Sequence, residues 1–233
     1  MTIPVILAHR GNLNGSNRET ANTVGAYRQA LEFGFGLEID VRRSFSNEFY
    51  ISHDQVSEYS NILLEVYEPH FRTYSKMPIA VNVKELGYEA KLASQLLAGA
   101  FGDRAFLFDF ELLEPLVPGR AQRLLRATDA CANVPMASRL SDRNEPMQQA
   151  LSIPAEITWA DEFDSLWLSE AHVNAVHEAG RRFYVISPEL HGFSRDERLS
   201  RWEDFARWRV DGICTDFALE ARSFFDSQTQ SKL

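Results

Sequence analysis

Short apolar segments alternate with amphipathic segments along almost the whole chain, and this alternation limits the possible folds more than any other feature of the sequence. Each apolar segment has six residues or fewer and is apolar on both faces, as in parallel strands buried between two layers. The segments between them have the spacing of apolar residues that is typical of helices. We predict eight strands, at residues 3–8, 36–41, 79–83, 105–110, 134–137, 156–159, 183–187 and 212–214.

Eight strands separated by helices in a chain of 233 residues predict an α/β fold, a single (β/α)8 TIM barrel that makes one domain of residues 1–233. The alternation alone does not show that the sheet closes, so an open, doubly wound sheet is the alternative. Residues 43–78 interrupt the rhythm, because an additional extended piece at 48–53 precedes an apolar segment around 62–67. We interpret this region as a short insertion after the second strand.

The charge of the chain argues against nucleic-acid binding, since 24 basic and 33 acidic residues leave a net charge of -9. The two cysteines, Cys131 and Cys214, lie in apolar segments and predict buried, reduced thiols, so we expect a cytoplasmic protein. No segment approaches the roughly 18 apolar residues that cross a bilayer, so no transmembrane segment is predicted. The last three residues, Ser231, Lys232 and Leu233, match a peroxisomal signal, and a peroxisomal location is the alternative.

Polar side chains collect where the predicted strands end, which is where TIM barrels carry their active sites. We therefore expect one functional rim at the carboxyl ends of the strands. Trp159 adds an apolar surface that suits a sugar ring or an acyl chain, with core packing as the alternative. The strand-end set comprises His9, Arg10, Glu38, Asp40, His53, Asn82, Lys84, Asp109, Arg139, Trp159, Asp161, Glu189, His191 and Asp216.

Glu38 and Asp40 are two positions apart on a predicted strand, so both side chains point to the same face. Inside an apolar segment, two carboxylates repel and raise each other's pKa unless a cation lies between them. A hard divalent cation such as Mg²⁺ or Ca²⁺, which binds oxygen ligands, would remove this cost. Structural ion pairs with Arg10 and Arg42 are the alternative.

His9, Arg10 and Gly11 bring three kinds of chemistry to the end of the first strand. An imidazole titrates near neutral pH and can transfer a proton. A guanidinium can hold a phosphate with two parallel hydrogen bonds, and a glycine lets the backbone come close to a ligand. His53 is a second histidine at a strand end, and it strengthens the case for proton transfer.

These motifs resemble the glycerophosphodiester phosphodiesterase family, within the phospholipase C-like phosphodiesterase barrels. The order and spacing of the motifs match from residue 5 to residue 55, whereas the middle of the chain matches only in its alternation of strands and helices. The motifs that carry the resemblance are AHRG at 8–11, NT at 22–23, EIDV at 38–41, HD at 53–54 and VDGICTD at 210–216.

The resemblance implies a phosphoric diester hydrolase in which His9 and His53 are the general acid–base pair. It also implies that Glu38 and Asp40 bind a divalent metal, Mg²⁺ or Ca²⁺. The phosphate contacts that it implies are Arg10 and Lys84.

The third acidic ligand of the family is replaced by Asn82, whose carbonyl can bind Mg²⁺ or Ca²⁺ without adding charge. Our own candidate to restore the lost charge is Asp109, one strand further on. Glu189, His191 and Trp159 are candidate substrate contacts.

We therefore predict metal-dependent cleavage of an anionic phosphodiester that is either small or linked to a lipid or sugar, with His9 favoured as the base and His53 as the acid. Attack by water gives hydrolysis, whereas attack by a neighbouring hydroxyl of the substrate gives a cyclic phosphate, so a lyase is an alternative. A second alternative, suggested by Asn82 and the atypical insertion, is a decayed barrel that only binds a phosphorylated ligand. A third is an aldolase- or isomerase-type barrel with Lys84 as the Schiff-base lysine.

Overall fold

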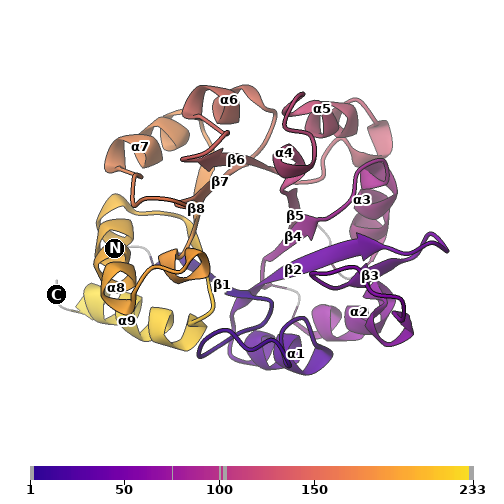
Figure 1. Cartoon of the computed structure of the whole chain (residues 1–233), viewed down its shortest axis with the longest axis horizontal. Helices are drawn as coiled ribbons and strands as arrows, with labels where there is room; N and C mark the ends of the chain where they lie inside the picture. Colours follow the sequence, from indigo (N-terminus) through magenta and orange to yellow (C-terminus); the bar gives the residue numbers. More distant parts are fainter. Residues whose placement is uncertain (1–2, 75, 100, 102–103, 231–233) are drawn as a thin grey trace.

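The structure is a computed structural model that describes residues 3–74, 76–99, 101 and 104–230, so the possible signal at 231–233 lies outside the described residues. Figure 1 shows a ring of strands seen end-on and surrounded by helices. Around the ring the parallel strands follow the order β5-β4-β2-β1-β9-β8-β7-β6. These strands are β1 (Val5–His9), β2 (Gly36–Arg43), β4 (Ile79–Val83), β5 (Ala105–Phe108), β6 (Ala137–Ser141), β7 (Ile157–Asp161), β8 (Arg182–Ile186) and β9 (Gly212–Thr215).

The ring is closed by contacts between strands that are far apart in the chain. β1 pairs with β9, with Val5 opposite Gly212. β5 and β6 meet at a parallel bridge between Leu107 and Met136, where the Leu107 N–H donates to the Pro135 carbonyl at 3.0 Å. The closed ring confirms the predicted TIM barrel and excludes the open, doubly wound sheet.

Helices cover the outside of the ring and connect its strands (Figure 1). In α1 the side chain of Thr23 accepts the Ala26 N–H at 3.2 Å, Tyr27 and Leu31 are buried, and Gly34 follows with a φ of +77°. Within the described ranges, no helix is both long and apolar enough to cross a membrane. The helices are α1 (Val24–Glu32), α2 (Leu64–Thr73), α3 (Glu89–Ala98), α4 (Phe110–Leu113), α5 (Arg120–Arg126), α6 (Met147–Ser152), α7 (Glu170–Glu178), α8 (Arg195–Trp208) and α9 (Ala218–Gln230), with short 3-10 helices at η1 (Ser60–Ile62), η3 (Asp129–Cys131) and η4 (Pro188–His191).

The inside of the barrel is filled by aromatic rings. Phe106, Phe108, Trp159 and Tyr184 form a buried cluster, and the ring centroids of Phe108 and Trp159 are 4.3 Å apart. A larger apolar core fills the layer between the ring and the helices. Because the barrel is packed and is not a channel, polar groups at the strand ends gather above this cluster, at the mouth.

The region at 43–78 contains an additional strand, β3, and a regular crossover helix, α2. β3 (Phe49–Ile51) folds back antiparallel on β2, with Tyr50 opposite Arg42, and carries the chain to His53. α2 then leads to β4 as an ordinary crossover helix. The insertion is therefore narrower than predicted and consists of the β2–β3 hairpin and the segment that precedes α2.

Only β4 has its predicted bounds, and the other seven barrel strands differ from the prediction by between one and four residues at an end. Two of these differences have a clear structural reason. β6 corresponds to the strand predicted at 134–137 but spans Ala137–Ser141, because buried Arg139 has carboxylate partners that let a polar sequence enter the core. The strand predicted at 105–110 stops at Phe108, since Asp109 has a left-handed φ of +75° and leads into α4. The thiols of Cys131 and Cys214 are buried and free, as predicted.

Candidate active site

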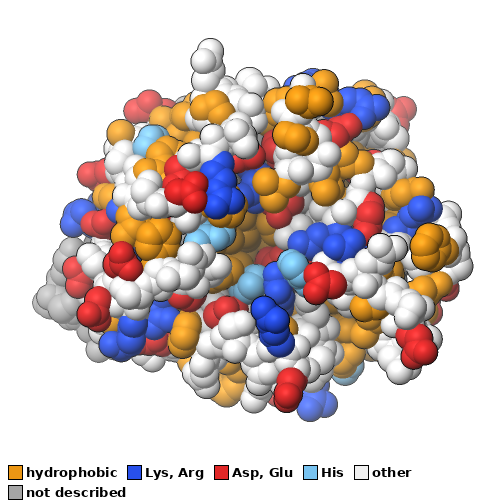
Figure 2. Space-filling view, viewed as in Figure 1, with side chains coloured by type: hydrophobic (Ala, Val, Ile, Leu, Met, Phe, Trp, Pro, Cys, Tyr) orange, Lys and Arg blue, Asp and Glu red, His pale blue; other side chains and the backbone are white. Residues whose placement is uncertain are grey.

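Two adjoining cavities open at the mouth of the barrel. The inner pocket, of about 260 Å³, lies over the barrel interior, and the outer groove, of about 820 Å³, runs between the β1–α1 loop and the segment after β3. Figure 2 shows this hollow with histidine and basic side chains around it. The predicted site residues all line the inner pocket except Glu189, which lines the groove, and Asp40, which is fully buried. The residues that line both cavities are His9, Arg10, His53 and Leu190.

His9, the last residue of β1, lies between two carboxylates. Its Nδ1–H donates to Asp216 Oδ1 at 2.7 Å, and its Nε2 lies 3.9 Å from Glu38 Oε2. Because an ionised carboxylate only accepts, the neutral ring carries its lone pair on Nε2. Burial alone lowers the pKa of His9, but the hydrogen bond to Asp216 and the charge of Glu38 outweigh it and raise this pKa above 6.5. His9 can therefore exchange a proton near neutral pH.

The turn after β1 has a left-handed backbone, with a φ of 52° at Arg10 and 80° at Gly11. A Cβ on Gly11 would lie 2.9 Å from the Cβ of Ala26 and 2.9 Å from the ring of Tyr27. The glycine is thus needed for α1 to pack against the turn, and its role in the approach of a ligand stays a prediction. The same turn places Arg10 at the junction of the two cavities.

β2 carries the predicted carboxylate pair, and both side chains are buried. Burial and the neighbouring charge of Asp40 raise the pKa of Glu38 to about 7. Glu38 Oε2 has no hydrogen-bond partner among the described residues. The repulsion expected between the two carboxylates therefore appears as the raised pKa of Glu38.

Asp40 is neutralised by cations of the protein itself. Arg10 Nε lies 3.0 Å from one carboxylate oxygen and Lys84 Nζ lies 2.8 Å from the other. Burial alone raises the pKa of Asp40, but the charges of Lys84 and Arg10 lower it below 3.8. Arg42, the other ion-pair partner that we considered, binds Glu85 at 2.6 Å instead.

Asn22 contributes to the site in a way that the sequence did not reveal. Its side-chain N–H donates to Asp40 Oδ2 at 2.9 Å, and the Tyr27 hydroxyl donates to its side-chain oxygen. The Tyr67 hydroxyl donates to the Asn22 carbonyl at 2.8 Å. Asn22 therefore links the buried face of α1 and α2 to the carboxylate on β2, and its place beside Thr23 in the NT motif was the available signal.

Two buried oxygens at the pocket are free to bind a cation. Glu38 Oε2 and Asn82 Oδ1 have no hydrogen-bond partners in the described part of the chain, and both are oxygen donors of the kind that Mg²⁺ and Ca²⁺ prefer. Asp40 would complete the set only if Lys84 moved away from it. Across the described ranges, no group of three or more His, Cys, Asp or Glu side chains is arranged to hold a metal ion.

The other side of the inner pocket is built on a buried guanidinium. Arg139 on β6 donates to Asp109 through Nη1 and to Asp161 through Nη2. Asp161 in turn accepts the Nε2–H of His191 at 2.8 Å. The carboxylate that we expected to replace the charge missing at Asn82 is thus bound to Arg139, and its role as a metal ligand remains a prediction.

His53 lies at the end of the β2–β3 hairpin, and 48% of its side chain is exposed. Its Nδ1–H donates to Asp54 at 2.9 Å. Arg42 donates to the His53 carbonyl at 2.9 and 2.7 Å, so the backbone is fixed even though the ring is open to solvent.

Glu189 is bound within the protein. The hydroxyls of Ser187 and Thr215 donate to its carboxylate, and the Asp216 N–H donates to it at 3.1 Å. Glu189 therefore fixes the loop that presents Asp216 to His9. Sequence reasoning placed Asp216 at a strand end but assigned it no role.

Trp159 lies on the floor of the inner pocket, with 1% of its surface exposed. It packs on Phe108 and belongs to the aromatic cluster inside the barrel. Phe163 is a further aromatic residue of the pocket, and its ring centroid lies 4.3 Å from that of His191. The pocket thus has an aromatic floor and wall beneath its charged rim.

No protein-family model matches the chain, and no curated protein sequence matches it. Solved structures match in fold. A glycerophosphodiester phosphodiesterase from Parabacteroides distasonis has a TM-score of 0.69 and 16% identity, over 97% of this chain and 98% of that one. A glycerophosphodiester phosphodiesterase from Agrobacterium tumefaciens has a TM-score of 0.66 and 18% identity, over 92% of this chain and 99% of that one. Another, from Thermotoga maritima, has a TM-score of 0.61 and 15% identity, over 94% of this chain and 96% of that one. The chain therefore has the fold of the glycerophosphodiester phosphodiesterases.

Proposed function

We propose that the protein is a phosphoric diester hydrolase of the glycerophosphodiester phosphodiesterase type. The observation that carries the proposal is the position of His9, bound to Asp216 on one side and near Glu38 on the other, in a pocket that also holds Arg10 and Lys84. A proton-transfer group beside two cations suits an anionic substrate whose charge increases during reaction. The fold shared with enzymes of this type supports the same reading.

Arg10 and Lys84 are the proposed phosphate contacts. Both lie at the rim of the inner pocket and both bind Asp40, which fixes their positions. A positioned cation stabilises the negative charge that develops on the phosphoryl oxygens in the transition state. Asp40 thus acts by holding these cations where the phosphate would bind.

His9 is proposed as the base. Its Nε2 takes a proton from water as the water oxygen bonds to phosphorus, and Asp216 stabilises the imidazolium that forms. The bond between phosphorus and one ester oxygen breaks, and that oxygen takes a proton from His53. After cleavage His9 is protonated and His53 is neutral. His9 then loses a proton to solvent and His53 takes one up, which restores the starting state.

Glu38 and Asn82 are the residues that would hold a divalent cation, because each has a buried oxygen without a partner. When bound, Mg²⁺ or Ca²⁺ would neutralise a nonbridging oxygen of the phosphate. Asp40 is the third proposed ligand and would bind the cation with Lys84 displaced from it. Asp109 is the alternative to Asn82.

Cleavage of bis(p-nitrophenyl) phosphate tests the proposal. We would compare the wild type with a His9→Ala/His53→Ala double variant, with and without Mg²⁺, Ca²⁺ and Mn²⁺. Release of p-nitrophenol that needs metal and is lost in the folded double variant would support the hydrolase. Absence of release from folded wild type in every metal would overturn it and favour a barrel that only binds a phosphorylated ligand.

A further inference from the structure

The proposed reaction involves only part of the lining of the outer groove, whose volume of about 820 Å³ is about three times that of the inner pocket. Cavities that bind small molecules commonly have volumes of about 300–1,000 Å³. The proposed catalytic residues His9, Arg10 and His53 line both cavities, so a phosphate held by them would lie at the junction. The two ester arms of one substrate would then extend into different cavities.

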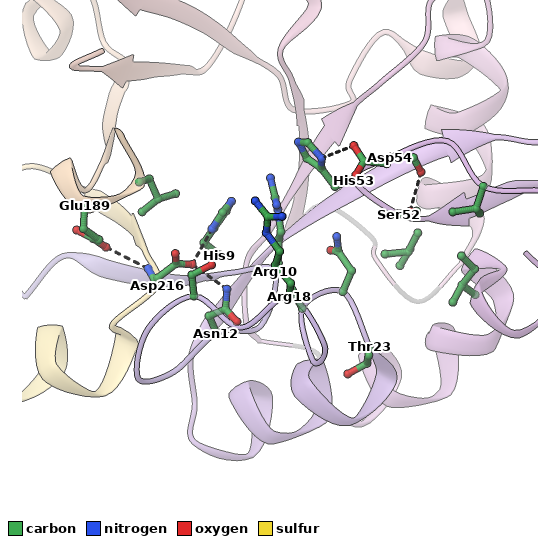
Figure 3. A pocket seen from close by; sticks show the side chains of 17 residues that line it. His9, Arg10, Asn12, Arg18, Thr23, Ser52, His53, Asp54, Glu189 and Asp216 are labelled. Carbon is green, nitrogen blue, oxygen red and sulfur yellow. Dashed lines mark hydrogen bonds and ion pairs between the residues drawn. The ribbon is translucent and has the colours of Figure 1, made fainter. Parts of the chain in front are cut away.

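Both cavities have charged side chains, but they differ in their apolar side chains, which are mainly aromatic in the inner pocket and aliphatic in the groove. The inner pocket has an aromatic floor and wall, formed by Phe108, Trp159 and Phe163. The groove combines polar side chains with aliphatic ones such as Ile51, Val56 and Ile62. Figure 3 shows Ser52, His53 and Asp54 on one side of it. Asn12, Arg18 and Thr23 come from the β1–α1 loop on the other side, with Glu189 and Asp216 at one end (Figure 3). The groove therefore offers hydrogen-bonding groups on both of its sides.

The carboxylates in the groove already have partners. Asp216 accepts from His9 and Asn12, Asp54 accepts from His53, and Glu189 accepts from two hydroxyls and a backbone N–H. Their acceptor oxygens are thus occupied within the protein.

Arg18 is different from the other charged residues of the groove. Its side chain is exposed, and in the described part of the chain it has no ion pair or hydrogen bond, whereas Arg10 is bound to Asp40. A guanidinium without a partner at the wall of a groove can bind a carboxylate or a phosphate through two parallel hydrogen bonds.

We infer that the outer groove is the binding site for one alcohol of the diester, a hydrophilic alcohol that carries a second negative charge and binds Arg18 through it. This inference rests on the proposed function and specifies its substrate as an asymmetric diester. The other alcohol occupies the inner pocket, the phosphate lies between His9 and His53, and the anionic alcohol extends along the β1–α1 loop.

Two p-nitrophenyl phosphodiesters test the inference, one with glycerol as its second alcohol and one with glycerate. Their leaving group is the same, so a difference in kcat/KM reports on the second alcohol. We expect the wild type to prefer the carboxylated diester by about tenfold at low ionic strength, and the preference to fall as salt screens the charge. Arg18→Gln should abolish the preference and leave kcat/KM for the glycerol diester within about twofold of the wild-type value.

Arg28→Gln is the matched control, because Arg28 is an exposed arginine of α1 that pairs with Glu32 and does not line the groove. It should leave the preference unchanged. The inference is overturned if the wild type has no preference, if Arg18→Gln keeps it, or if Arg18→Gln weakens both diesters equally, since Arg18 would then serve the scissile phosphate.

Calorimetric binding separates the inference from the proposed function. Glycerol 3-phosphate and 3-phosphoglycerate are the monoesters that the two diesters would leave, and they bind without any reaction. Tighter binding of 3-phosphoglycerate that is lost in Arg18→Gln supports the groove site even if neither diester is cleaved. Equal binding of the two monoesters overturns the groove site even if both diesters are cleaved.

Discussion

Nδ1 of His9 lies 2.7 Å from Oδ1 of Asp216, although 207 positions separate the two residues in the chain. The pairing of β1 with β9 brings them together at the end of neighbouring strands. Asn12 donates to the same carboxylate at 2.8 Å, and Glu189 holds the backbone of Asp216. The orientation of the proposed base therefore depends on the closure of the barrel.

Asp216→Asn should lower kcat/KM for bis(p-nitrophenyl) phosphate by about 10²–10⁴, because His9 loses the acceptor that fixes its tautomer and stabilises its charge. Since Asp216 raises the pKa of His9, the variant should also shift the acidic limb of the pH profile to lower pH. The measurement is kcat/KM between pH 5 and 9.

Asp211→Asn is the control for that variant, because Asp211 pairs with His177 at 2.8 Å outside both cavities. It should leave the pH profile unchanged. A folded Asp216→Asn protein with wild-type activity and profile would remove His9 from the role of base.

Much of the fold could be predicted, because buried parallel strands are apolar on both faces and the helices between them are amphipathic. β4 has the predicted bounds, and Thr23 caps α1 as expected. β6 was misplaced because its sequence, Ala137–Ser141, contains Arg139, which only tertiary carboxylate partners make compatible with burial. No local pattern contains that information.

The candidate site was predictable as a set of strand ends but not as a set of contacts. The type of each residue indicates what chemistry it can perform. Its partners are not visible in the sequence, because those of His9 and His191 come from other strands of the closed ring. The binding of Asp40 to Lys84 and Arg10 likewise depends on the neighbouring strand and on a left-handed turn. Pairings of this kind follow from geometry that hydrophobic periodicity does not specify.

His53→Ala should reduce cleavage of a diester with an alkyl leaving group by about 10²–10⁴, because an alkoxide leaves poorly without a proton. The loss should be much smaller for bis(p-nitrophenyl) phosphate, whose leaving group is stable as an anion. His70→Ala, on α2 and outside both cavities, should change neither rate. Equal losses for both substrates in His53→Ala would contradict a role as leaving-group acid.

Glu111→Gln should raise the free energy of unfolding at pH 8. Glu111 is buried, and burial raises its pKa to about 7, while one of its carboxylate oxygens has no partner among the described residues. A carboxyl whose pKa is higher in the folded state stabilises the protein below its unfolded pKa, near 4.5, and this contribution is lost as pH rises through about 7.

The shift in the Glu111 pKa corresponds to about 3 kcal/mol as an upper bound, so the advantage of Glu111→Gln should approach that value by pH 8 and vanish below pH 4.5. The glutamine keeps an oxygen for the Gln122 side chain and the Arg139 N–H, which donate to Glu111 at 2.9 and 3.3 Å. Urea unfolding at several pH values measures the difference, with exposed Glu65→Gln as the control. A difference that does not depend on pH would contradict the raised pKa.

Binding of Ca²⁺ or Mg²⁺ should raise the melting temperature more at pH 8 than at pH 6. Burial and Asp40 raise the pKa of Glu38 to about 7, so at pH 6 a cation must displace the proton from this carboxyl, and its apparent affinity should be about tenfold lower than at pH 8. A cation at 100 times its Kd stabilises a protein by about 2.7 kcal/mol, which a thermal melt detects readily. Glu38→Gln should abolish the dependence on pH and weaken the shift, whereas Glu58→Gln, an exposed position, should keep both. If millimolar cation produces no shift at either pH in the wild type, Glu38 and Asn82 do not form a cation site and the proposed metal dependence fails.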